Sequence, residues 1–201
     1  MANGRVCTGF SLPKVAKYAV SSGTVSYSNV TALARGVDVT ISIEADSDNN
    51  FYADNVLAES DRQAFSSGTL SLTVDGLKDT ARKLISGVVT TSSTTVSTGV
   101  TVTWDIYDDA AVVPYVGVGF VARYMEDGVT SFVPIVLKKV KFDDPSITAA
   151  TQGESIDWQT QSLEGKIMRD DSSSHAWRMI GTALTTEAAA ESAVLKALGA
   201  T

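Results

Sequence analysis

The stretch VDVTISIE, residues 37–44, decides the fold class. Its odd positions are apolar and its even positions are polar or charged, so its side chains repeat with a period of two. Successive side chains of a β-strand point to opposite faces, and this pattern therefore predicts a strand with one dry face and one wet face. The dry face has to be covered by another layer, which favours a packed β-sheet.

The same alternation recurs further along the chain. LSLTV at residues 70–74, VTVTW at 100–104 and IDWQTQ at 156–161 each predict another half-buried strand. Valines recur every few residues in the Ser/Thr-rich stretch 90–101, which therefore indicates strand and turn within one domain and not a linker.

A β-hairpin is predicted in the middle of the chain. Residues 116–124 and 132–142 are rich in β-branched side chains and lie on either side of the turn signal EDG at 126–128. Gly117 and Gly119 fit the dinucleotide-binding pattern G-x-G-x-x-A, but β-prone residues follow where that motif requires a helix. We interpret both glycines as places where a strand twists or comes close to a neighbour.

Two segments have helical spacing. Apolar residues at i, i+4, i+7 and i+8 from Leu77 to Ile85 predict a helix that ends at Gly87. Residues 185–199 are rich in alanine, begin with threonines that can cap a helix and end with glycine, so they predict a C-terminal helix. Together with the strands, these segments predict one mainly-β (α+β) domain over residues 1–201, a sandwich or barrel with one helix packed against it.

Composition limits the possible functions. The formal charge is −7 and the pI is about 4.6, and an acidic surface of this kind repels phosphate, so the chain is not expected to grip a nucleic acid. Cys7 is the single cysteine, which rules out an internal disulfide and a cysteine-based zinc site. No apolar run approaches the length needed to cross a bilayer. We expect a soluble protein that is made in a reducing cytoplasm.

Motifs for catalysis or metal binding are incomplete. His175 is the single histidine and lies among serines, but the chain has no GxSxG motif, so we interpret it as a solvated loop residue. Residues 46–50, DSDNN, resemble the start of a calcium loop, yet Phe51 stands where that loop needs glycine and Leu57 where it needs glutamate. The sequence therefore predicts no catalytic residue, no metal and no cofactor.

Several motifs in order along the chain carry a family resemblance. They are GFSLPKVAKY at 9–18, FYADN at 51–55, VGVGF at 116–120 with EDG at 126–128, LKKVKF at 137–142 followed by Pro145, and GESIDW at 153–158 followed by LEG at 163–165. This ordered set resembles the major tail proteins, or tail-tube proteins, of long-tailed phages with non-contractile tails. It extends over nearly the whole chain, and FYADN is its most distinctive part.

The resemblance implies a β-sandwich with a flanking helix that assembles into hexameric rings, which stack into a tube. Such a tube encloses the tape-measure protein during assembly and guides the genome from capsid to host. The other implied partners are the tail terminator and the tail-tip (distal tail) proteins. The implied location is the virion tail, and the host cytoplasm during assembly, with DNA passing through without specific binding and without membrane insertion.

Two groups of residues are candidates for this role. Residues 45–67 are too many for a turn and contain apolar side chains, so we expect a long stacking-type loop. The residues expected in contact with a neighbouring ring are Phe51, Tyr52, Ala53, Asp54 and Asn55. The acids expected to line the lumen are Asp38, Glu44 and Asp157, on the wet faces of predicted strands.

Other functions remain open at this point. The tube of a contractile injection or secretion machine differs mainly in needing a sheath partner. A carbohydrate- or receptor-binding β-sandwich would present clustered exposed aromatics, whereas Trp104 and Trp158 are expected on buried strand faces and Trp177 alone in a loop. A hydrolase would have to use His175.

Overall fold

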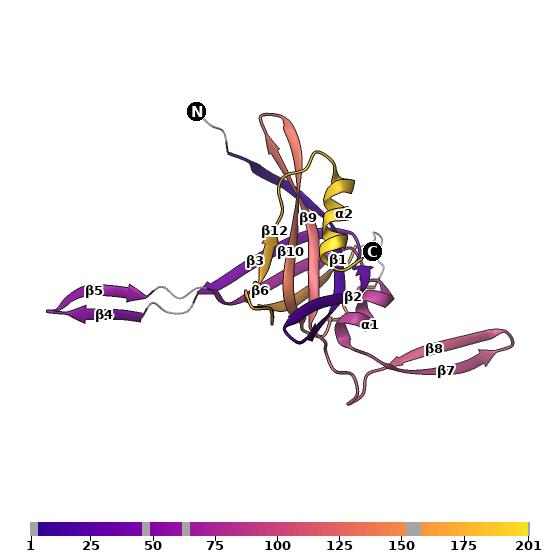
Figure 1. Ribbon diagram of the computed structural model, residues 1–201. Coiled ribbons are helices and arrows are strands. Elements are labelled where there is room, and N and C mark those ends of the chain that lie inside the picture. The colour runs from indigo at the N-terminus through magenta and orange to yellow at the C-terminus, as the bar shows by residue number, and fades with distance from the viewer. Residues whose placement is uncertain (1–3, 46–48, 62–64, 152–157, 201) are drawn as a thin grey trace.

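The computed structural model describes residues 4–45, 49–61, 65–151 and 158–200 (Figure 1). Its main sheet has eight strands, in the order β2-β1-β9-β10-β11-β6-β3, with β12 also pairing with β10. Two further pairs, β4-β5 and β7-β8, form separate two-stranded sheets. The prediction of a mainly-β chain is confirmed.

The strands of the main sheet are β1 (Val6–Ser21), β2 (Thr24–Ala32), β3 (Gly36–Ala45), β6 (Phe65–Val74), β9 (Val116–Glu126), β10 (Val129–Phe142), β11 (Gln161–Met168) and β12 (Arg178–Ile180). All the pairs between them are antiparallel. The stretch 37–44 lies in β3, as its alternation predicts. The predicted hairpin is β9–β10, which turns at Asp127 and Gly128, both with positive φ.

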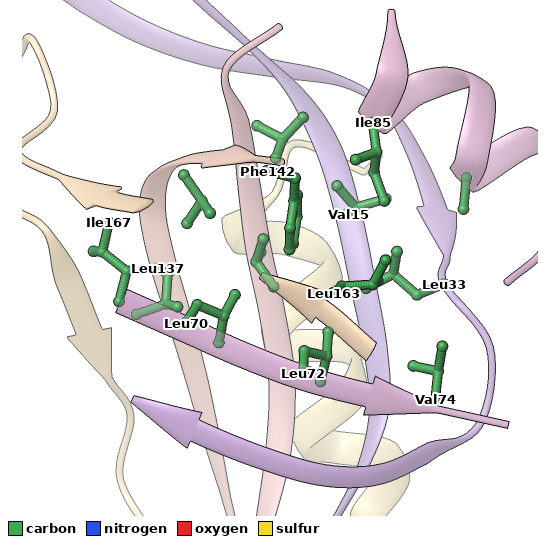
Figure 2. Close-up of a cluster of buried hydrophobic side chains, with 14 of the residues drawn as sticks. Val15, Leu33, Leu70, Leu72, Val74, Ile85, Leu137, Phe142, Leu163 and Ile167 are labelled. Carbon is green, nitrogen blue, oxygen red and sulfur yellow. The ribbon is translucent and has the colours of Figure 1, made fainter. Parts of the chain in front are cut away.

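The sheet folds over so that its two ends enclose one core. In Figure 1, β3 and β6 cross the direction of β9 and β10, and Figure 2 shows β6 side chains pointing at those of β10 and β11. The buried residues at this centre include Leu70 and Leu72 of β6, Phe142 of β10 and Leu163 of β11. Burying such side chains is the main stabilising contribution to a domain of this size.

Two helices pack on the sheet, where one flanking helix was expected. Helix α1 (Asp79–Ser86) contributes Ala81 and Ile85 to the main core and ends at Gly87, which is left-handed at φ 70°. Helix α2 (Glu187–Ala197) is capped by Thr186, whose side chain accepts a hydrogen bond from the Ala189 amide. It is shorter than the predicted 185–199.

Helix α2 covers the face of β9 opposite the main core. Gly117 and Gly119 make this close approach possible, because a Cβ on Gly119 would lie 2.5 Å from Cγ1 of Val194 in α2. A Cβ on Gly117 would lie 2.5 Å from the ring of Tyr27 and 2.9 Å from Leu198. The interpretation of these glycines as points of close approach is therefore confirmed.

Strand β11 begins later than predicted. It starts at Gln161, whereas residues 158–160 are not in a strand, and Ile156 and Asp157 lie outside the described residues. Trp158 is 83 % exposed, so the expectation that it lies on a buried strand face is wrong. Regular alternation in 156–161 misled because periodicity alone does not show where pairing with a neighbour begins.

Candidate assembly surfaces

The segment that contains FYADN forms an arm, not a loop. Strands β4 (Asn49–Ala53) and β5 (Val56–Asp61) pair as a two-stranded hairpin that extends away from the main sheet (Figure 1, left). Asp54 and Asn55 both have positive φ, at 50° and 64°, which is the backbone of the tight two-residue turn that suits strand twist. The prediction of a long loop over 45–67 is wrong in this part of the segment.

The arm exposes apolar side chains on both of its faces. In the register of the hairpin, Tyr52 lies opposite Leu57, while Ala53 lies opposite Val56 on the other face. The exposed fractions of Phe51, Tyr52, Val56 and Leu57 lie between 49 % and 66 %. An isolated two-stranded hairpin is at best marginally stable in water, and no described residue covers these apolar side chains.

The predicted contact residues thus have different places in the arm. Phe51 and Tyr52 present large exposed apolar surfaces, and Ala53 is exposed between them and the turn. Asp54 and Asn55 set the turn that brings β4 and β5 together. FYADN therefore combines exposed apolar side chains with the turn that joins the two strands of the arm.

A second surface is the outer face of β3, β6 and β11, which we call the hydroxyl face. Its members on β3 are Asp38, Thr40, Ser42 and Glu44; on β6, Ser67, Thr69, Ser71 and Thr73; and on β11, Ser162, Glu164 and Lys166. The opposite side chains of β6 and β11, such as Leu72 and Leu163, are buried. Alternation therefore gives β6 and β11 a dry core face, leaves the apolar side chains of β3 half-buried or exposed, and gives all three strands a wet outer face rich in hydroxyl groups.

Both described lumen candidates lie on the hydroxyl face. Asp38 lies opposite Thr73, and Glu44 accepts a hydrogen bond from Ser67 Oγ at 3.0 Å. A similar cross-strand bond joins Ser71 Oγ to Glu164 at 2.7 Å. The structure thus puts Asp38 and Glu44 on the same face near opposite ends of β3, whereas Asp157 lies outside the described residues.

A buried ion pair fixes the end of β11 to β10. The Asp170 side chain is fully buried, forms an ion pair with Lys138 and accepts a hydrogen bond from Ser172 Oγ at 2.7 Å. Burial raises the pKa of Asp170, but the hydrogen bonds from Lys138 and Ser172 outweigh this effect, and the pKa lies below the ordinary aspartate value. The carboxyl group of Asp170 is therefore ionised at neutral pH.

The adjacent pair lies closer to solvent. Asp171 accepts bonds from Lys139 Nζ and from Tyr18 Oη, both at 2.7 Å, and these bonds lower its pKa. Burial and the bond to Asp171 raise the pKa of Tyr18 to about 12. Lys138 and Lys139 of β10 thus form ion pairs with Asp170 and Asp171, which follow β11. These two ion pairs fix the segment after β11 against β10.

His175 is the residue that a hydrolase would have to use. His175 is exposed in a loop, and its Nδ1 lies 3.3 Å from the backbone oxygen of Asp170. Within the described ranges no three His, Cys, Asp or Glu side chains gather as a metal site would require. Residues 46–48 of the calcium-like motif lie outside those ranges.

Reasoning from sequence missed a second arm. Strands β7 (Thr90–Ser97) and β8 (Val100–Ile106) form a hairpin that projects from the body near α1 (Figure 1, lower right). Trp104 on β8 is 55 % exposed, so its expected burial is wrong. Trp177, expected in an exposed loop, is half-buried and stacks on Phe65 with ring centres 4.5 Å apart.

The signal for this second arm is present in the sequence. Val100, Val102, Trp104 and Ile106 alternate with polar residues, which correctly predicts a strand. Alternation shows that one face is apolar, but it does not show whether the same chain covers that face.

None of the helices among the described residues is long and apolar enough to cross a membrane. A scan of protein-family models and a search of curated proteins both find no match to this chain.

Proposed function

We propose that this chain is a structural virion protein, the subunit of the tail tube of a long-tailed phage with a non-contractile tail. Copies assemble into hexameric rings, and the rings stack into a conduit for the genome. The observation that supports this most is the β4–β5 arm, which holds exposed apolar side chains away from the body on a ribbon too small to be stable alone.

The arm supplies the contact between rings. Phe51 and Tyr52 present large flat surfaces at little cost in side-chain entropy, which makes aromatic residues effective at interfaces. In a stacked tube they insert against the neighbouring ring, and this burial removes the apolar surface from water. Burying an aromatic side chain of this kind contributes roughly 1.5–3 kcal/mol.

The hydroxyl face lines the lumen. Its serines and threonines interact well with water, and its acids Asp38, Glu44 and Glu164 outnumber its one lysine, Lys166, so the face is negatively charged. Six copies at −7 place about −42 formal charges on each ring, which repels the DNA backbone so that the genome slides without adsorbing. A conduit of this kind requires no cofactor and no catalytic residue.

The partners follow from this role. The tube encloses the tape-measure protein while it grows, and it ends at the tail terminator and at the tail-tip proteins. The chain belongs to the virion tail and assembles in the host cytoplasm, as a single tail-tube domain over residues 1–201.

Electron microscopy of the concentrated protein tests the proposal. Negatively stained wild-type chain should form rings or tubes with a hollow centre, most readily in salt high enough to screen the repulsion between acidic copies. Tyr52→Ser should leave rings but shorten or abolish tubes, while Thr103→Ser, a matched change on the other arm's polar face, should leave tubes intact. A strictly monomeric wild-type chain at every concentration and salt would refute the proposal.

Charge reversal tests the lumen separately. The double variant Asp38→Lys, Glu44→Lys should assemble but hold DNA, and so slow genome ejection from assembled particles. Glu126→Lys, on the exposed tip of β9, is the control for added positive charge. If the double variant ejected DNA at the wild-type rate, the hydroxyl face would not be the lumen.

Two other functions make different predictions. The tube subunit of a contractile injection or secretion machine would co-purify with a sheath protein. A carbohydrate- or receptor-binding module is favoured by one observation, the exposure of Trp104 and Trp158. It predicts glycan-array binding that Trp158→Ala abolishes, and this result would replace the tube proposal.

A further inference from the structure

The β7–β8 arm has two unlike faces. Strand β8 turns Val100, Val102, Trp104 and Ile106 to one side, and their partners on β7 are small hydroxyl residues such as Ser92 and Thr94. Thr101, Thr103 and Asp105 point to the other side, where Thr103 and Ser93 share a hydrogen bond of 2.9 Å. We call the first set the apolar row. Most of it is exposed, although its alternation is that of a strand with one buried face.

The arm is held in a fixed direction at its base. Asp105 accepts a bond from Arg82 at 3.1 Å and lies 2.7 Å from Lys83 Nζ, and both basic residues belong to α1. Arg82 also donates to Tyr107 Oη at 3.0 Å. These contacts orient the arm before it binds, and such preorganisation reduces the entropy lost on association.

The same chain carries a groove whose lining is mainly apolar, with Lys17 and Lys83 also among the lining residues. It has a volume of about 620 Å³ and lies between β2, α1 and the segment that leads into β9. Its apolar lining comes from Val30, Leu84, Val88, Val89, Val112 and Pro114. Val89 and Val112 are both 73 % exposed, so the groove presents uncovered apolar surface of its own.

Charge indicates which molecule covers the arm. Residues 90–104 contain no Asp, Glu, Lys or Arg, although 19 % of the whole chain is charged. A site for nucleic acid would require basic residues in the arm, and a site for a basic protein would require acidic residues there. Two copies of an acidic chain repel each other, so a contact between copies is best made by an uncharged ribbon.

We propose that the apolar row of one copy seats in the groove of a second copy of this chain. The ribbon and the groove are different surfaces, so each copy gives an arm to one neighbour and receives an arm from another. A head-to-tail contact of this kind forms a ring when the rotation from one copy to the next completes a circle, and this is the geometry that the proposed tube requires. The inference rests on the proposed tube and adds the contact within a ring, which is distinct from the β4–β5 contact between rings.

A pair of matched variants tests the row. Trp104→Lys should weaken self-association, measured by sedimentation velocity over a concentration series, by roughly tenfold or more, as loss of a central aromatic does. Thr103→Lys places the same charge on the other face of the ribbon and should change association by less than about threefold. Equal effects of the two variants would overturn the proposal.

Cysteine crosslinking tests the groove. In a Cys7→Ser background, one batch carries Val102→Cys on the apolar row and the other carries Ala110→Cys at the groove. Under mild oxidation the mixture should form a disulfide-linked dimer, whereas Thr103→Cys with Ala110→Cys should not. A yield no higher than that of the control would overturn the proposal.

The two proposals can fail separately. Tubes without the crosslink would leave the tail-tube function in place and remove this contact. If the cysteine variants formed the crosslinked dimer while the wild-type chain formed no rings, the arm contact would be supported and the tube refuted.

Discussion

Replacing Lys138 with methionine should destabilise the fold strongly at neutral pH. The Asp170 side chain is fully buried and that of Lys138 is 15 % exposed, so Lys138→Met leaves a buried carboxylate with Ser172 as its remaining side-chain donor. Breaking a buried ion pair from one side costs about 3–5 kcal/mol. Asp170→Asn should cost less, roughly 1–3 kcal/mol, because the partly exposed ammonium of Lys138 can turn towards water.

Urea unfolding followed by circular dichroism measures these changes, at a protein concentration low enough that assembly adds no stability. The control is Asp171→Asn, in which the adjacent aspartate is 45 % exposed, so the loss should stay under about 1 kcal/mol. The double variant Lys138→Met, Asp170→Asn should cost less than the sum of the single changes. Strict additivity, or equal losses in Asp170→Asn and Asp171→Asn, would refute the role given to the buried pair.

Three further outcomes are expected. Because the folded pKa of Asp170 is lowered, its contribution to the unfolding free energy should be fully present above about pH 5 and should be lost as pH falls below about 4. A pH series should therefore find a smaller loss in acid for Asp170→Asn than for the wild-type chain. Gly119→Ala should lower the melting temperature by forcing α2 away from β9, since its Cβ would meet Val194, whereas Gly76→Ala, which has open space, should not; equal melting temperatures would contradict the packing argument. Thr186→Ala removes the α2 cap and should cost about 1 kcal/mol in urea unfolding, with Thr185→Ala unchanged as the control.

Sequence patterns predict where strands and helices lie better than they predict which side chains are buried. The alternation in 37–44 and 70–74 predicts β3 and β6 correctly, because a strand with one wet face needs that pattern wherever it lies. Gly87 and Thr186 mark a helix end and a helix start through backbone geometry and capping that depend on local residues alone. Helix ends and starts of this kind can be predicted from the sequence because neighbouring residues alone determine them.

Burial is harder to predict, because it depends on residues far apart in the chain. Trp104 alternates like a core residue, yet its strand belongs to a ribbon outside the main sheet. Trp177 has the neighbours of a loop residue, yet Phe65, distant in sequence, supplies its stacking partner. Asp54 and Asn55 form a hairpin turn without glycine. The usual sequence signal for such a turn is therefore missing, and the sequence predicts a loop where the structure has the arm.

The β4–β5 arm emerges between two strands that are already neighbours. β3 and β6 pair along their length up to Glu44 opposite Ser67 and Ala45 opposite Phe65, and the arm lies between these two ends in the sequence. Residues added or removed in pairs within the arm therefore preserve the core ladder and every buried contact behind it. The length of the arm and its fit to a neighbouring molecule can thus change through insertions and deletions in this segment, while the rest of the protein keeps its sequence.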